Sequence, residues 1–121
     1  MAANTIFALS SGRPPAAISV IRVSGPEAHE AGRRIAGSLP DARVAAVREL
    51  RHPHTGQLLD EALVLRFDSP ASSTGEDSVE LHCHGGRAVV NAVLAALGDR
   101  GAFHGMPAGP LVCRGARFAG R

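Results

Sequence analysis

The 121-residue sequence contains no tryptophan and no tyrosine, and its aromatic residues, all phenylalanine, make up 3% of the chain. A platform on which nucleic-acid bases could stack is therefore not expected. A block of basic residues is missing as well, because the basic residues are scattered arginines and the formal net charge is only +2. This charge permits contact with nucleic acid without arguing for it.

Cysteine is also scarce, since Cys83 and Cys113 are the only two in the chain. Two cysteines are too few for the disulfide framework of a small secreted protein, which favours a reducing compartment. The N-terminal stretch lacks the basic and long apolar segments of a signal peptide, and no apolar run approaches membrane-spanning length. We therefore expect a cytoplasmic protein with no membrane partner.

Two nucleotide-binding motifs are absent from the sequence, the phosphate loop GxxxxGK[ST] and the dinucleotide fingerprint GxGxxG. Gly85 and Gly86 precede an expected helix and could present backbone N–H groups to an anion. A tight turn from strand to helix is the more common reason for such a pair. The chain therefore carries no GTPase motif, and we assign no catalytic residue.

Hydrophobic periodicity predicts the secondary structure. Alternating or β-branched runs predict strands at residues 5–9, 17–23, 43–50, 58–67 and 78–84, although 43–50 could also be a short helix. Helices are expected at residues 24–36 and 86–97. Because the strands outnumber the helices, we predict an α+β fold, with a mixed β-sheet and two to three helices packed mainly on one side.

Local signals refine this prediction. Ser24 and Glu27 have the spacing of a capping box, and Gly37 is the expected end of the first helix. In the strand at 78–84, three residues are expected to point inward (Val79, Leu81, Cys83) and three to point the other way (Glu80, His82, His84).

The C-terminal part of the chain, residues 98–121, loses all periodicity and is rich in glycine, arginine and alanine. This composition predicts a loop or disorder. We assign residues 1–106 to a domain and residues 107–121 to an atypical C-terminal tail of the same domain.

The run Thr74-Gly75-Glu76-Asp77 is the most suggestive local group. A glycine allows close approach of the backbone, and carboxylates accept paired N–H donors such as those on the amino-pyrimidone edge of a pterin. A loop whose threonine and aspartate cap a turn is the alternative interpretation.

Arg22 and His82 are further candidates. Arg22 stands at the end of an apolar strand, where its charge requires a carboxylate, a carbonyl or an anionic ligand. His82 and His84 share one face of a strand and could reach one metal ion. A structural zinc site needs four ligands, and nothing in the sequence places His52 and His54 nearby, so we assign no metal site.

Four segments carry a resemblance to a known family. They read TIFALSSGRPPAAISVIRVSGPEA at 5–28, LRHPHTGQLLDEALVLRF at 50–67, STGEDSVELHCHGG at 73–86 and RAVVNAVLAAL at 87–97. In this order and spacing they resemble the N-terminal domain of the MnmE (TrmE) family of tRNA-modification GTPases. The resemblance implies a fold shared with tetrahydrofolate-dependent aminomethyltransferases.

The same resemblance implies a function. The domain would bind 5-formyl- or methylene-tetrahydrofolate and form a homodimer. The full-length system, with the FAD-dependent partner MnmG, modifies the wobble uridine of certain tRNAs at C5 (carboxymethylaminomethyl). GTP, K⁺ and Mg²⁺ belong to the helical and GTPase domains, which this chain lacks.

The resemblance, together with the chemistry above, assigns folate-binding residues: Arg22, Thr74, Gly75, Glu76, Asp77 and His82. Glu76 would accept from the pterin amino groups, and Arg22 would offer a cation to a carbonyl or carboxylate oxygen. In the tail, PAGPLVCRGARFAGR at 107–121 lacks the family's Glu and Arg groups, which help to build the folate pocket. The alternative is therefore a dimerisation or interaction module with a defective folate site.

Overall fold

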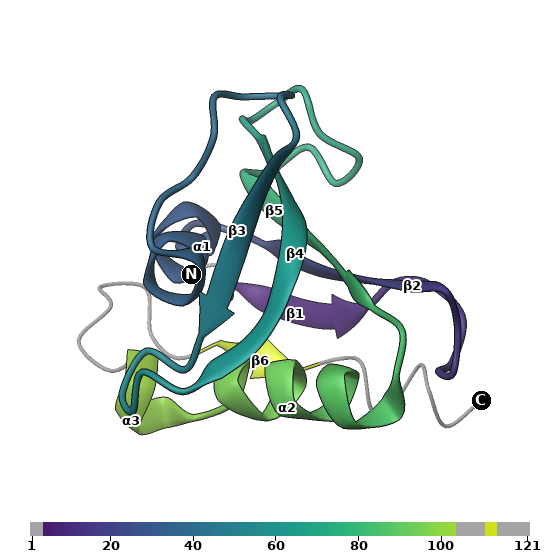
Figure 1. Ribbon diagram of the computed structural model, residues 1–121. Helices are drawn as coiled ribbons and strands as arrows, with labels where there is room; N and C mark the ends of the chain where they lie inside the picture. The colour runs from purple at the N-terminus through teal and green to yellow at the C-terminus, as the bar shows by residue number, and fades with distance from the viewer. Residues whose placement is uncertain (1–3, 104–110, 114–121) are drawn as a thin grey trace.

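Six strands form one sheet in the order β3-β4-β5-β2-β1-β6 (Figure 1). The computed structural model describes residues 4–103 and 111–113. Its elements are β1 (Ile6–Leu9), β2 (Ile18–Ser24), α1 (Ala28–Ala36), β3 (Ala46–Arg51), β4 (Leu58–Phe67), β5 (Ser78–His84), α2 (Arg87–Leu97), α3 (Arg100–Phe103) and β6 (Val112–Cys113).

The sheet is mixed, as predicted. β1 to β5 pair with their neighbours in antiparallel fashion, whereas β6 runs parallel to β1. The α+β fold class is confirmed, and the predicted bounds of β4 and β5 agree with the structure. The ambiguous segment at 43–50 is a strand from residue 46 onward.

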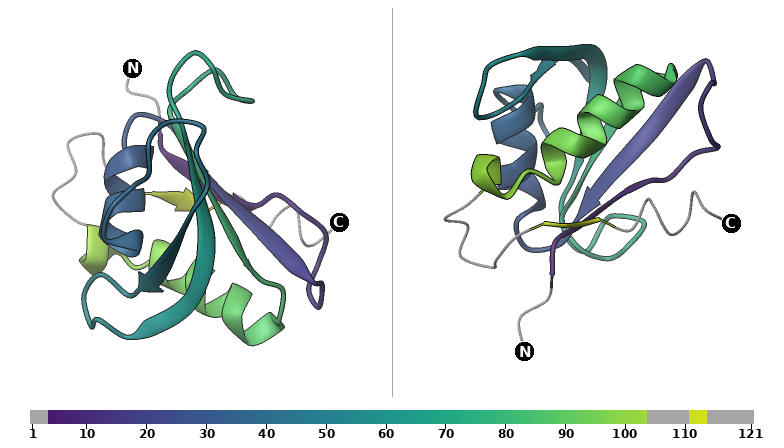
Figure 2. Two further views of the ribbon diagram at one scale, coloured as in Figure 1. Left: turned by 45° about the horizontal axis from the view of Figure 1, so that its top comes forward. Right: turned by 90° about the horizontal axis from the view of Figure 1, so that it is seen from below.

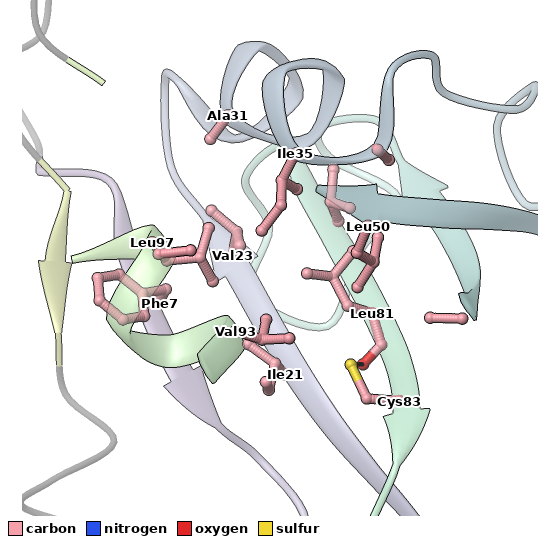
Figure 3. Packing of buried hydrophobic residues seen from close by; sticks show 14 of the residues in the cluster. Phe7, Ile21, Val23, Ala31, Ile35, Leu50, Leu81, Cys83, Val93 and Leu97 are labelled. Atoms are coloured by element: carbon pink, nitrogen blue, oxygen red, sulfur yellow. Dashed lines mark hydrogen bonds between the residues drawn. The ribbon is translucent and has the colours of Figure 1, made fainter. Parts of the chain in front are cut away.

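Helices α1 and α2 pack against one face of the sheet and enclose the core with it (Figures 1 and 2). Ile35 of α1 and Val93 and Leu97 of α2 lie among the inward side chains of β2 and β5 (Figure 3). The inward orientation predicted for Val79, Leu81 and Cys83 is confirmed, because all three are buried. Burial, followed by the nearby charge of Asp60, raises the pKa of the Cys83 thiol to about 12.

The opposite side of the sheet is called the open face below. It carries Leu63, Leu65 and Phe67 of β4, because Ala62 and Val64 alternate with them into the core. Leu63 is 41% exposed and Val47, its partner on β3, is 55% exposed. Within the described residues no helix is long and apolar enough to cross a membrane.

The predicted capping box at the start of α1 is wrong. Ser24 remains in β2, and its hydroxyl pairs with the Thr74 hydroxyl at 2.7 Å instead of capping the helix. Glu27 is the N-cap residue and makes no side-chain capping bond; its backbone N–H donates to the Thr5 hydroxyl at 2.8 Å, which ties the start of α1 to the segment before β1. The predicted end at Gly37 is confirmed, with φ of +83° and its N–H bonded to the Arg33 carbonyl.

The prediction of loop or disorder after residue 98 is wrong for two segments. Helix α3 places Phe103 in the core with 2% exposure, and β6 extends the sheet beside β1. Neither element is long enough to produce a periodic pattern, and both form through tertiary contacts. The predicted boundary at 106/107 lies outside the described residues.

Candidate functional site

Arg22, Glu80 and His82 meet on the open face. The pairing of β2 with β5 sets Arg22 opposite Glu80. The Arg22 Nη2 and Nε groups donate to Glu80 Oε2 at 2.9 Å and 3.3 Å, and His82 Nε2 lies 3.0 Å from Glu80 Oε1. The partner that Arg22 requires is therefore a carboxylate on the neighbouring strand.

Glu80 is the centre of this cluster and is mostly buried, with 16% of its side chain exposed. Burial by itself raises its pKa, but the hydrogen bonds from His82 and Arg22 prevail and hold the pKa below 4.5. Glu80 is therefore ionised at neutral pH. Its two oxygens offer about four acceptor positions, so they can accept further N–H donors.

Glu80 also lines a pocket of about 370 Å³ on the open face, together with Arg43, Phe67, Ala71, Ser72 and Ser73. The Arg43 guanidinium carbon lies 5.9 Å from the centroid of the Phe67 ring. The pocket thus combines an aromatic ring, a cation, two hydroxyls and an ionised carboxylate. This composition suits a flat heterocycle with several N–H groups.

The loop between β4 and β5, residues 68–77, closes one side of this pocket. The Thr74 hydroxyl contacts Ser24 and accepts from the Glu76 N–H at 3.3 Å. Gly75 has φ of +80°, a backbone conformation that L side chains rarely adopt. Thr74 and Gly75 therefore shape the loop itself.

Glu76 and Asp77 lie elsewhere, on a smaller pocket of about 280 Å³ lined also by Gly25, Pro26 and Ser69. Asp77 Oδ1 accepts the Ser69 N–H at 2.8 Å. The predicted site residues thus fall into two groups. Arg22 and His82 gather on the open face, while Glu76 and Asp77 are beside the start of α1.

Sequence reasoning missed Glu80, Arg43 and Phe67 as site residues. Strand alternation already placed Glu80 on the same face as His82. The missing information was that β5 pairs with β2, which brings Glu80 against Arg22 from 58 residues away. Arg43 likewise lines the pocket only because the segment between α1 and β3 lies beside the end of β4.

Three of the histidines considered for a metal, His52, His82 and His84, lie beside three different carboxylates. His84 Nδ1 lies 2.8 Å from Asp60 Oδ1, and His52 Nε2 lies 3.0 Å from Asp99 Oδ2. Within the described part of the chain, the groups of three or more potential metal ligands do not include His82 or His84. His82 and His84 thus each face a different carboxylate, Glu80 and Asp60 respectively.

A larger groove, of about 500 Å³, lies between the C-terminal end of α1 and β3. Arg34, Arg48 and Arg51 line it, but none of the predicted site residues does. Arg48 donates to the Ser38 carbonyl just after α1, which is the usual role of a cation near a helix C-terminus.

Comparison with known proteins identifies the family to which the chain is similar. A family model described as "GTP-binding protein TrmE N-terminus" matches residues 5–118. The tRNA modification GTPase MnmE of Erythrobacter litoralis is 63% identical over 95 residues, which are 78% of this chain and 22% of that protein. The protein of the same name from Azorhizobium caulinodans is 53% identical over 111 residues, 92% of this chain and 26% of that protein.

A mitochondrial relative is also similar. The 5-taurinomethyluridine-[tRNA] synthase subunit GTPB3 of Danio rerio is 48% identical over 118 residues, 98% of this chain and 23% of that protein. The chain thus spans about a quarter of the length of these curated relatives. Because the family model covers nearly all of it, the chain belongs to the family of the N-terminal domain of MnmE-type (TrmE) tRNA-modification GTPases.

Proposed function

We propose that this chain is the tetrahydrofolate-binding and dimerisation domain of a GTPase that modifies the wobble uridine of tRNA at C5. The family assignment supports the tRNA-modification part of the proposal. The observation that carries the folate part is the ionised Glu80 in an aromatic-lined pocket on the open face.

In the proposed complex, the pterin of 5-formyl- or methylene-tetrahydrofolate enters the pocket of about 370 Å³. Glu80 accepts from the amino-pyrimidone N–H groups, and Arg22 fixes the orientation of that carboxylate. The Phe67 ring offers a surface for the heterocycle, and Arg43 offers a cation to a carbonyl or carboxylate oxygen of the ligand.

Glu76 and Asp77 define a second location for the pterin, in the pocket of about 280 Å³. We favour the Glu80 pocket because it is larger and contains the aromatic ring. In this proposal Thr74 and Gly75 hold the loop that separates the two pockets, and His82 helps to keep Glu80 ionised.

The open face also supports the proposed homodimer. Val47 and Leu63 are paired on β3 and β4, and Ile18 on β2 is 54% exposed. Apolar side chains gathered on one surface are typical of a protein interface. A second copy of the chain, facing the first across this surface, would remove them from water.

Other components of the proposed system act outside these 121 residues. GTP, K⁺ and Mg²⁺ would bind in the helical and GTPase parts of the longer protein, and MnmG and tRNA would be partners of that full-length system. We also propose a cytoplasmic location, because Cys83 and Cys113 are both free thiols.

Calorimetric titration with 5-formyltetrahydrofolate tests the folate site. The parent chain is expected to bind about one folate per chain. Glu80→Gln should weaken binding at least about tenfold, because a hydrogen bond to a charged group is lost. Glu61→Gln is the matched control, since Glu61 is an exposed acid on β4, and it should leave the affinity unchanged.

Other results would redirect the proposal. Loss of binding in Glu76→Gln, with Glu80→Gln unaffected, would move the site to the smaller pocket. A folded parent chain that does not bind folate would favour the interaction module with a defective site and direct attention to residues 107–121.

A further inference from the structure

His29, in the first turn of α1, lies between the two aspartates that flank the loop at 68–77. His29 Nε2 is 3.3 Å from Asp68 Oδ1, and His29 Nδ1 is 3.8 Å from Asp77 Oδ2. His29 belongs to α1, Asp68 directly follows β4, and Asp77 directly precedes β5. Only 18% of the His29 side chain is exposed, so its ring is held in place by its surroundings.

One nitrogen of the His29 ring has a further partner. Nε2 lies 3.1 Å from the Phe67 carbonyl oxygen, which can only accept a hydrogen bond. Nε2 therefore carries a proton, and Nδ1 is the ring nitrogen that faces Asp77. A histidine that binds a metal commonly donates its other N–H to a backbone carbonyl in this way.

Both aspartate side chains are also held in place by hydrogen bonds from neighbouring residues. Asp77 Oδ1 accepts the Ser69 N–H at 2.8 Å, which leaves Oδ2 directed toward His29. Asp68 accepts from the Arg66 guanidinium at 3.0 Å and 3.3 Å. Arg66 therefore pairs with Asp68, while both carboxylates lie beside the single imidazole of His29.

The spacing between His29 and Asp77 suits an ion between the two side chains better than a direct hydrogen bond. The 3.8 Å between His29 Nδ1 and Asp77 Oδ2 is too long for a hydrogen bond. One potential ligand atom from each of the three residues lies within 4.8 Å of the others. Ligand bonds to zinc of about 2.0–2.2 Å place neighbouring tetrahedral ligands about 3.3–3.5 Å apart. Asp77 therefore has to move slightly closer to Nδ1, and Asp68, which lies 3.3 Å from Nε2, has to rotate toward the same nitrogen.

We propose that His29, Asp68 and Asp77 form a zinc-binding site that fastens both ends of the 68–77 loop to α1. One imidazole and two carboxylates are suitable zinc ligands, and three protein ligands leave a position for water. The site is separate from Glu80 and does not depend on folate binding. A bound ion would stabilise the fold, because all three ligands come together only in the folded chain.

Zinc titration of the full chain, carrying Cys113→Ser to remove the exposed thiol, tests this site. Calorimetry should show saturable binding of one Zn²⁺ per chain, and Zn²⁺ should raise the melting temperature. Asp77→Asn keeps the shape of the side chain but removes a charged ligand, and it should weaken zinc binding at least tenfold. His29→Ala should have a similar effect.

His84→Gln is the matched control, because His84 also pairs with an aspartate but lies outside the proposed site. This variant should bind zinc as the parent does. Circular dichroism without zinc identifies any variant that fails to fold, and Asp68→Asn then replaces it. The proposal is overturned if the parent shows no saturable binding, or if Asp77→Asn and the folded His29 or Asp68 variant bind zinc as tightly as His84→Gln.

Discussion

At the scale of single residues, the open face depends on a carboxylate held between a guanidinium and an imidazole. Arg22 and His82 satisfy one oxygen each of Glu80 and lower its pKa below 4.5 against the opposing effect of burial. Such a carboxylate is ionised and fixed before any ligand arrives. The orientation of the group is therefore established when the chain folds.

The lowered pKa makes the contribution of Glu80 to stability depend on pH. A carboxyl group whose pKa is lower in the folded state stabilises the fold above its unfolded-state pKa, and this stabilisation is lost as the pH falls through the folded-state value. Glu80→Gln should therefore cost about 1–3 kcal/mol of unfolding free energy at pH 7. The difference from the parent should shrink as the pH falls below 4.5.

Urea denaturation of the parent and of Glu80→Gln, at a series of pH values from 7 to 3, checks this expectation. Glu61→Gln serves as the control and should change the unfolding free energy by less than about 0.5 kcal/mol. A difference between parent and Glu80→Gln that stays constant over the series would show that the charge of Glu80 is not what stabilises the cluster.

At the scale of elements, the strands were predictable where a side-chain pattern repeats. The bounds of β4 and β5 follow from alternation over 10 and 7 residues. β6 has only 2 residues and no pattern of its own, so it forms through its pairing with β1. The start of α1 was missed because the sequence cannot show that Ser24 is engaged by Thr74 of the loop at 68–77.

The site was predictable in part for the same reason. The charge of Arg22 on an apolar strand indicated that a partner must exist, and the structure supplies Glu80. The identity of that partner depends on strand order, which no local pattern encodes. The proximity of Glu76 and Asp77 in the sequence suggested one site, yet the loop turns them away from Arg22.

The turn from β5 to α2 gives a prediction at this scale. A Cβ at Gly85 would lie 2.6 Å from the Ala16 carbonyl carbon, whereas a Cβ at Gly86 would meet nothing within 4 Å. Gly85→Ala should destabilise the chain by about 1–3 kcal/mol through this overlap. Gly86→Ala should cost less than about 1 kcal/mol.

Thermal unfolding of both alanine variants measures the difference. Equal losses would show that the turn requires two glycines for a reason other than space, such as a bound anion at the start of α2. The larger loss at Gly85 would support the simpler interpretation of a tight strand-to-helix turn.

At the scale of the whole molecule, the fold separates two surfaces. The helices cover one face of the sheet (Figure 2). The open face presents both the Glu80 pocket and the exposed apolar side chains. Folate binding and dimerisation, as proposed, would therefore use neighbouring parts of one surface. The two properties can be tested separately because Leu63 does not line the pocket.

Leu63→Arg is expected to convert the proposed dimer to a monomer. Leu63 is 41% exposed, so a charge there leaves the core intact but opposes burial against a second copy. Sedimentation velocity measures the association state. Ala95→Arg adds the same charge on the exposed side of α2 and should leave the dimer unchanged. A parent that sediments as a monomer would contradict the proposed dimer.

The central claim is that the open face around Glu80 binds tetrahydrofolate. The most direct measurement is an NMR titration of the ¹⁵N-labelled chain with 5-formyltetrahydrofolate, with every amide assigned. The account predicts that the largest shifts appear at Arg22, Phe67, Ser72, Ser73 and Glu80. Shifts confined to Gly25, Glu76 and Asp77, or no saturable shifts at all, would contradict it.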